Sequence, residues 1–128
     1  MKTIIIDGYN IIHSIPAFSS KLKESLRAAR GALVLYLSAW KRKYSNAEVY
    51  VVFDTGSKYE FDFERVNLHD INCLFPKTTG GADEYIKSMV RDAEEPRDIL
   101  VISDDNNIRR NSRIHGAIVK HADFLLRK

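Results

Sequence analysis

The stretch that decides the fold stands at the start of the chain and reads TIIIDGYN, residues 3–10. Its three consecutive isoleucines predict a strand that is buried on both faces, because a strand with one face in water alternates apolar and polar residues. The Asp-Gly pair that follows is a turn signal and ends this strand at Asp7. Strands of this kind are typical of parallel sheets that carry helices on both sides.

Other parts of the chain repeat this apolar, β-branched design. Residues 49–53 and 98–103 form two such runs, and each is followed directly by an aspartate. Residues 71–75 and 117–119 predict two shorter strands. Residues 55–70 are polar and aromatic by turns, which is compatible with an edge strand or a hairpin arm in which Tyr59, Phe61 and Phe63 share a face.

Helical patterns separate these strands. Apolar residues recur at steps of three and four over residues 21–44, which predicts one long helix with Ser19 or Ser20 as its N-cap. Gly31, in the middle of that helix, suggests close packing against the sheet. Further helical segments are predicted at residues 82–93, 106–113 and 122–126. The resulting order predicts the α/β class, with a mainly parallel five-stranded sheet covered on both sides.

The composition is that of an ordinary globular domain. Of 128 residues, 45% are hydrophobic and 29% are charged, which excludes a disordered chain, and we expect one domain over residues 1–128. Cys73 is the only cysteine, which excludes an intrachain disulfide and a thiolate zinc cluster. No apolar run approaches the roughly 20 residues that cross a bilayer, and because the first strand begins at Thr3 we expect no signal peptide before it. We therefore expect a cytoplasmic protein without a membrane partner, monomeric or weakly self-associating.

Aspartates follow three of the predicted strands. Because the carboxyl ends of parallel strands lie along one edge of a sheet, Asp7, Asp54 and Asp104 should cluster there. Asp83, at the start of a helix, and Asp105 can reach the same crevice. Each aspartate alone could be a turn or cap residue, but all of them at one edge favour a functional site.

A divalent cation would relieve the repulsion among carboxylates packed this closely. The available ligands are hard oxygens, which suit Mg²⁺ or Mn²⁺ rather than Zn²⁺, and magnesium held by a few carboxylates and several waters is typical of chemistry on phosphates. The four histidines share no metal-ligand spacing and receive no role. They are His13, His69, His115 and His121.

Polar and basic residues that could contact a polyanion lie near the same motifs. Asn10 follows Asp7 by three residues and could hydrogen-bond a phosphate oxygen or orient a carboxylate, or be a turn residue only. Tyr9 could stack on a base or pack in the core. The net charge of +3 and the pI near 9.0 permit a polyanionic partner without requiring one. Two basic groups are candidates for phosphate contacts, with a solvated helix face as the alternative: Lys23, Arg27 and Arg30, and then Arg109, Arg110 and Arg113.

The order of four short motifs resembles that of the NYN domain of the PIN-like nuclease superfamily, in its YacP-like branch. The motifs are DGYN at 7–10, VFD at 52–54, GADE at 81–84 and SD at 103–104. The resemblance covers essentially the whole chain. It implies a three-layer α/β/α fold with an acidic pocket at the carboxyl edge of the sheet. It further implies Mg²⁺- or Mn²⁺-dependent endoribonuclease activity, in which a metal-activated water attacks phosphorus and leaves 5′-phosphate and 3′-hydroxyl ends.

The same resemblance assigns roles to individual residues. It implies that the catalytic acids are Asp7, Asp54, Asp83 and Asp104. Among them Asp7, Asp83 and Asp104 are the foremost metal ligands. Asp105 is included in the metal-binding set with a weaker claim, as a neighbour of a motif position, and Glu84 likewise has a weaker claim. It implies substrate contacts from Asn10, Tyr9, Arg27, Arg30 and Arg109. The implied partner is single-stranded RNA, with messenger RNA and ribosome-associated RNA both left open.

Two other readings compete with the nuclease. The first is a PIN-like module that binds RNA or protein without cutting, which would have no physical need to concentrate carboxylates at one edge. The second is a phosphatase or phosphotransfer domain that also places aspartates at strand ends. The first strand lacks a second aspartate two residues after Asp7, so the nucleophile and acid pair of such phosphatases is missing.

Overall fold

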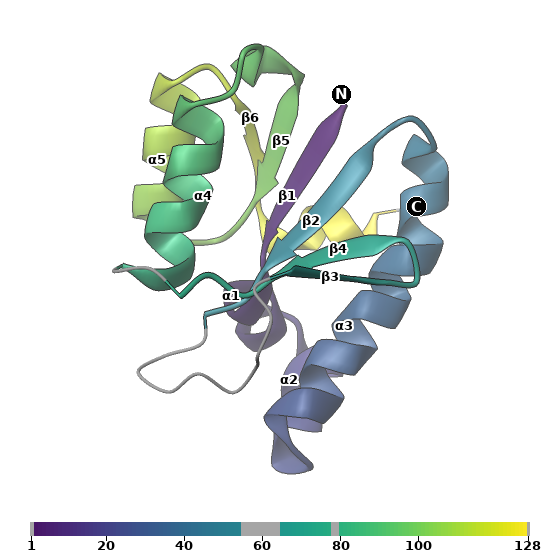
Figure 1. Ribbon diagram of the computed structural model, residues 1–128. Coiled ribbons are helices and arrows are strands. Elements are labelled where there is room, and N and C mark those ends of the chain that lie inside the picture. The colour runs from purple at the N-terminus through teal and green to yellow at the C-terminus, as the bar shows by residue number, and fades with distance from the viewer. Residues whose placement is uncertain (1, 55–64, 78–79, 128) are drawn as a thin grey trace.

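The computed structural model describes residues 2–54, 65–77 and 80–127, which form a sheet with helices on both faces (Figure 1). The sheet has the strand order β3-β4-β2-β1-β5-β6, and all its pairs are parallel except β3 with β4. The strands are β1 (Thr3–Asp7), β2 (Glu48–Val52), β3 (Arg65–Leu68), β4 (Ile71–Leu74), β5 (Ile99–Ile102) and β6 (Ile118–Lys120). The α-helices are α1 (Gly8–Ser14), α2 (Pro16–Ser19), α3 (Leu26–Trp40), α4 (Gly81–Arg91) and α5 (Asn106–Ile114). Short 3-10 helices are η1 (Ser20–Lys23), η2 (Lys41–Tyr44), η3 (Pro96–Asp98) and η4 (Ala122–Leu126).

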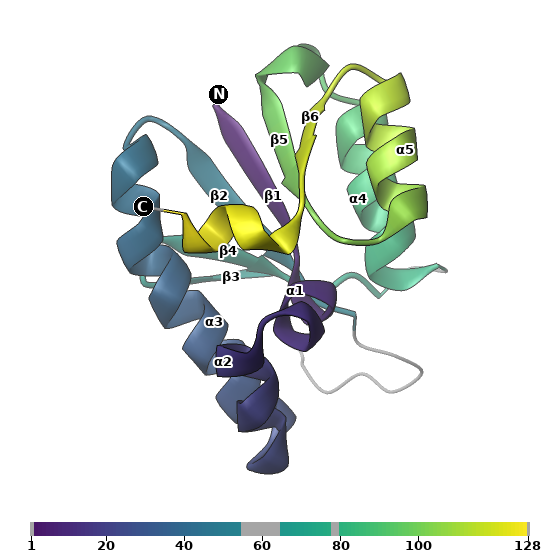
Figure 2. The same ribbon diagram turned by 180° about the vertical axis from the view of Figure 1, so that it is seen from behind.

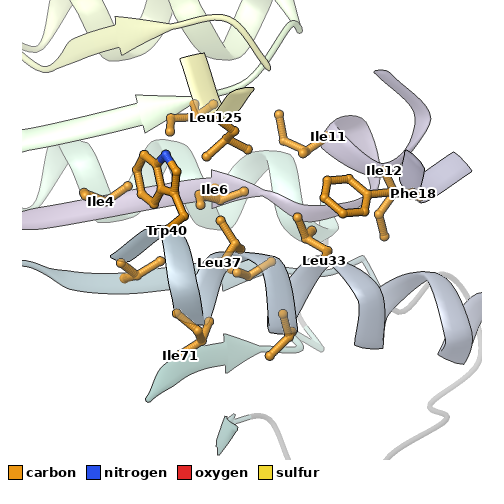
Figure 3. Packing of buried hydrophobic residues seen from close by; sticks show 14 of the residues in the cluster. Ile4, Ile6, Ile11, Ile12, Phe18, Leu33, Leu37, Trp40, Ile71 and Leu125 are labelled. Carbon is orange, nitrogen blue, oxygen red and sulfur yellow. The ribbon is translucent and has the colours of Figure 1, made fainter. Parts of the chain in front are cut away.

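Strand β1 lies in the middle of the sheet, and its three isoleucines are fully buried, as the sequence predicts. Ile4 and Ile6 pack with α3 on one face, where Leu33, Leu37 and Trp40 complete the larger core (Figure 3). Ile5 faces the other side and joins the core formed with α4 and α5. Figures 1 and 2 show α4 and α5 on one face and α3 with η4 on the other, which confirms the three-layer α/β arrangement.

The sheet has six strands rather than the five expected. The additional strand is β3, an edge strand that pairs with β4 in an antiparallel hairpin, so the edge strand or hairpin arm expected within residues 55–70 is confirmed at residues 65–68. His69 and Asp70 form its turn with positive φ values of 53° and 66°, and Ser38 Oγ donates to the His69 carbonyl at 2.9 Å. The expected face of Tyr59, Phe61 and Phe63 lies outside the described residues.

The long helix expected over residues 21–44 is three pieces, η1, α3 and η2. Ser25 breaks it, because its backbone is extended and its side chain accepts from the Ala28 N–H at 2.9 Å as the N-cap of α3. The prediction of Ser19 or Ser20 as the cap was therefore wrong. Gly31 is exposed, and no atom lies within 4 Å of the position that a Cβ would take, so the expected close packing there was also wrong.

Helix α1 follows β1 without a loop, an element that the sequence did not resolve. The connection depends on Gly8, since a Cβ at this position would stand 2.5 Å from Phe53 Cδ1 and 2.9 Å from the Val52 carbonyl oxygen. Phe53 in turn lies 5.3 Å from the Tyr9 ring and 5.5 Å from the Phe75 ring, centroid to centroid. This close approach of α1 to the end of β2 places Tyr9 and Asn10 at the carboxyl edge of the sheet.

No helix in the described parts of the chain is long and apolar enough to span a membrane.

We expect Gly8→Ala to lower the free energy of unfolding by about 1–3 kcal/mol, because the added methyl group overlaps a packed ring and a backbone carbonyl. Gly31→Ala is the matched control, and we expect it to stabilise the protein by up to about 1 kcal/mol, because its site is open and helical. Urea unfolding of both variants measures the difference. Equal midpoints for the two variants would contradict this account of the β1–α1 connection.

Candidate active site

Four aspartates from different elements meet at the carboxyl edge of the sheet. Asp7 ends β1, Asp54 lies two residues beyond β2, Asp83 is in the first turn of α4, and Asp105 is the N-cap of α5. Asp83, Asp105 and Asp54, in that order, each raise the pKa of Asp7 by charge repulsion. The structure therefore brings together four of the five aspartates that the sequence places at this edge.

Asp7 is the buried member of this group, with 6% of its surface exposed. Burial is the largest cause of its raised pKa, the neighbouring carboxylates add to it, and a hydrogen bond from Ser103 opposes it. The pKa of Asp7 rises from 3.8 to about 6 as a result. A carboxylate held this way keeps a proton more readily than any exposed acid and gains most from a nearby cation.

Asp54 and Asp83 are placed by the N-terminus of α4. A Cβ on Gly81 would lie 2.9 Å from both carboxylate oxygens of Asp54, so only glycine allows this carboxylate to pack against the start of the helix. Gly80 and Gly81 both have positive φ values, 90° and 59°, which other residues rarely adopt. The pKa of Asp83 is raised, first by burial and then by Asp105, while Lys87 opposes the shift.

Ser103 belongs to the SD motif at residues 103–104, but the sequence assigned it no role of its own. It is completely buried, its Oγ donates to Asp7 Oδ2 at 2.7 Å, and the same Oγ accepts from the Asp105 N–H at 3.0 Å. Asn10 Oδ1 accepts from the Asp104 N–H at 2.8 Å. Together these bonds fix the loop after β5 against β1 and α1, and hold Asp7 and Asp105 in one arrangement.

Asp104 is turned away from this group. Its Oδ1 accepts from the Ala122 N–H and lies near His121 Nδ1, each at 2.9 Å. Burial acts to raise the pKa of Asp104, but hydrogen bonds, including those from Ala122 and His121, outweigh it and lower the pKa. Asp105 faces the acidic group instead, although the resemblance ranks Asp104 above it as a ligand. No spacing in the sequence indicates the contact between Asp104 and His121, which lie 17 residues apart.

The expected substrate residues fall into two groups. Arg30, on α3, donates from Nη1 to Tyr9 Oη at 2.8 Å, which places a guanidinium beside the DGYN motif. Tyr9 packs against Phe53 and is partly buried, so the structure places it in the wall of the site. Arg27 is exposed on α3, and Arg109 is half-buried on α5, one turn beyond Asp105. Glu84 is exposed and lies 3.5 Å from Lys87 Nζ.

The donor set fits a hard divalent cation. It consists of carboxylate oxygens, with one buried carboxylate under repulsion from three others. Within the described residues, no three His, Cys, Asp or Glu side chains stand ready to bind one ion directly. Magnesium usually keeps several of its waters and takes only one or two carboxylates, so this spacing is compatible with a hydrated ion.

A mostly parallel α/β sheet with carboxylates gathered at its carboxyl edge is the arrangement of PIN-like, nuclease-type domains. The sequence profile of the YacP-like NYN domain matches residues 4–128, and the chain belongs to this family.

Relatives of known structure agree with this assignment. The chain is 28% identical over 91 residues to "Uncharacterized protein YacP" of Bacillus subtilis, an alignment that covers 71% of this chain and only about half, 52%, of the relative. The crystal structure of Rae1 (YacP) from Bacillus subtilis has a TM-score of 0.77 at 27% identity, over 98% of this chain and 72% of that chain. The W164L mutant of Rae1 has a TM-score of 0.75 at 25% identity, over 98% and 73% of the two chains.

We expect Asp7→Asn to stabilise the metal-free protein at neutral pH. Because folding raises the pKa of Asp7 from 3.8 to about 6, the folded state binds its proton more tightly, and stability falls as the pH rises between these values. The penalty above pH 6 corresponds to about 3 kcal/mol. Asparagine removes the charge and still accepts from Ser103.

The measurement is urea unfolding in chelator across the acid range. The stabilisation by Asp7→Asn should be largest at neutral pH and should disappear near pH 4. Asp123→Asn is the control, since Asp123 is exposed and its contact with Arg127 is long, at 3.8 Å. A pH-independent difference between Asp7→Asn and the original chain would contradict the assigned cause.

Proposed function

We propose that the protein is an Mg²⁺- or Mn²⁺-dependent endoribonuclease that hydrolyses phosphodiester bonds in single-stranded RNA. The observation that carries this proposal is the buried carboxylate of Asp7, whose pKa is raised by burial and by Asp83, Asp105 and Asp54. Perturbed carboxylates clustered at a sheet edge are typical of catalytic sites. Membership of a nuclease-type family points to the same chemistry.

In this proposal the carboxylates of Asp7, Asp83 and Asp105 hold a hydrated cation, one or two of them directly and the rest through its waters, and Asp54 adds negative charge from the end of the neighbouring strand. When bound, the cation supplies a nucleophile at neutral pH and stabilises the leaving oxygen. Asp104 does not bind the cation in this proposal, because its carboxylate is bound by His121 and Ala122. It contributes to the site only through its backbone N–H, which donates to Asn10.

The chain's own residues position the reacting groups. Ser103 holds the Asp7 carboxylate through its hydroxyl and fixes the backbone of Asp105. Arg30, anchored on Tyr9, offers a guanidinium to a phosphate beside the scissile bond. Arg27 and Arg109 are candidates for more distant phosphates, and their contribution is electrostatic.

We expect the purified protein to cut a labelled single-stranded RNA with Mg²⁺ or Mn²⁺ and not in chelator. Asp83→Asn and Asp105→Asn should abolish cutting, and calorimetric titration should show Mn²⁺ binding weakened by about tenfold or more, because ligand charge sets the affinity. Asp104→Asn should retain Mn²⁺ binding, since its carboxylate is bound elsewhere.

These outcomes separate the nuclease from its rival. Mn²⁺ binding that depends on Asp83 and Asp105, with no cutting of any RNA, would favour a non-catalytic RNA- or protein-binding module. Loss of Mn²⁺ binding in Asp104→Asn, with retention in Asp105→Asn, would reverse the proposed ligand assignment.

We expect Arg30→Ala to weaken RNA binding and to reduce its salt dependence by one phosphate contact, a change of about 0.7 in the slope of log K against log salt for single strands. Tyr9→Phe removes the hydroxyl that accepts from Arg30 but keeps the ring against Phe53. The affinity for RNA should therefore fall, while the slope of log K against log salt stays unchanged. Arg97→Ala is the control, because Arg97 is exposed in η3 before the start of β5. Equal slopes for Arg30→Ala and Arg97→Ala would exclude a phosphate contact by Arg30.

A further inference from the structure

His121 and Asp104 form a pair beside the loop that follows β5. The sequence assigned no role to His121, and the proposed cleavage reaction does not use it. It follows β6 directly and begins η4. Its imidazole Nδ1 lies 2.9 Å from Asp104 Oδ1, and 55% of its side chain is exposed.

The sheet places His121 in line with the catalytic edge. Ile6 of β1 aligns with Ile102 of β5, and Ile102 aligns with Lys120 of β6, so the next residues along the three strands are Asp7, Ser103 and His121. Two strand spacings separate the first from the last, which is about 10 Å. A nucleotide strand bound at Asp7 and extending toward β6 therefore passes His121.

The contact with Asp104 fixes the orientation of the imidazole. Asp104 Oδ1 also accepts from the Ala122 N–H at 2.9 Å, so this oxygen is the acceptor of the contact with the imidazole, and Nδ1 donates to it. The Asp104 carboxylate is itself held by the Ala122 N–H, and the Asp104 backbone by Asn10. Nε2 consequently points away from Asp104, and the imidazole makes no other hydrogen bond or ion pair within the described residues.

The chemistry of this nitrogen selects its ligand. With Nδ1 protonated and the ring neutral, Nε2 accepts a hydrogen bond, which a phosphate oxygen cannot donate. A ribose 2′-hydroxyl can both donate and accept, so it suits Nε2 in either protonation state of the ring. The same segment of the chain carries two cations suited to phosphates, Lys120 and Arg127, whose Nζ and Cζ atoms stand 5.7 and 5.9 Å from the centroid of the Phe124 ring.

We propose that His121, oriented by Asp104, binds a ribose 2′-hydroxyl of the substrate strand and thereby makes the site selective for RNA over DNA. This inference rests on the proposed ribonuclease function and adds a sugar-recognition subsite to it. His121 acts by direct contact with the substrate, and Asp104 is its positioning residue.

The test is a scan of single 2′-deoxy substitutions along a fluorescent oligouridine of about ten nucleotides, with binding measured by anisotropy in Ca²⁺. For the original chain, one position should lose about three- to tenfold in affinity, the value of one neutral hydrogen bond. His121→Asn keeps a donor for Asp104 but has no atom at the position of Nε2. This variant should bind every oligonucleotide as weakly as the original chain binds the one that carries the 2′-deoxy substitution at the sensitive position. His121→Gln keeps a polar atom near Nε2 and should restore part of the sensitivity.

His115→Asn is the matched control. His115 is also exposed and bonded at Nδ1, to the Asn111 carbonyl at 2.9 Å, but it lies at the far end of α5. The His115→Asn variant should show the same loss of affinity at the same 2′-deoxy position as the original chain. A merely structural His121 would lower affinity for every oligonucleotide and leave the 2′-deoxy effect intact, which overturns the inference.

The outcome also separates this inference from the proposed function. If the original chain binds and cuts RNA but no position is sensitive, or if the sensitivity survives in His121→Asn, only the sugar subsite is refuted. If the original chain binds no RNA with any divalent cation, the ribonuclease proposal fails together with it.

Discussion

Burial of the Asp7 carboxylate between neighbouring acids is the constraint on which the rest of the structure depends. The isoleucines of β1 fix the strand in the middle of the sheet, and its carboxyl end delivers Asp7 into a position that is 6% exposed. Ser103, which directly follows the adjacent strand β5, donates a hydrogen bond from Oγ to Asp7 Oδ2 at 2.7 Å. The glycines at positions 8 and 81 admit the ring of Phe53 and the carboxylate of Asp54 to the same edge. Each feature has a local physical reason, and all of them concentrate negative charge.

The loop after β5 divides its two aspartates between two tasks. Asp105 Oδ1 caps α5 through the Ile108 N–H at 2.9 Å, and its charge acts on Asp7 and Asp83. Asp104 turns toward the end of β6 and binds His121. Ser103 and Asn10 hold the backbone of this loop, so the two directions are fixed together. One edge of the sheet thus presents carboxylates near β1 and an oriented imidazole near β6.

The sequence predicts those features of the fold that the local pattern of apolar and polar residues determines. The double-sided burial of Ile4 to Ile6, the parallel core strands and the gathering of strand-end aspartates all follow from hydrophobic period and topology. It does not predict what depends on contacts between distant segments. The break at Ser25 is hidden because the residues of η1 continue the helical period. The choice between Asp104 and Asp105 depends on which backbone amide each carboxylate binds, that of Ala122 for Asp104 and that of Ile108 for Asp105, and only the tertiary structure decides that.

The energetics of the acidic group argue for a cation more strongly than its composition does. An asparagine at position 7 would accept the same hydrogen bond from Ser103 without the repulsion of Asp83, Asp105 and Asp54. The fold alone therefore gives no reason for a carboxylate at this position. The repulsion among these carboxylates destabilises the metal-free protein, and it contributes to the raised pKa of both Asp7 and Asp83. A bound cation would offset this repulsion, which explains why the carboxylates are gathered here. In the proposed nuclease, stability is given up where the chemistry requires charge, as it commonly is at catalytic sites.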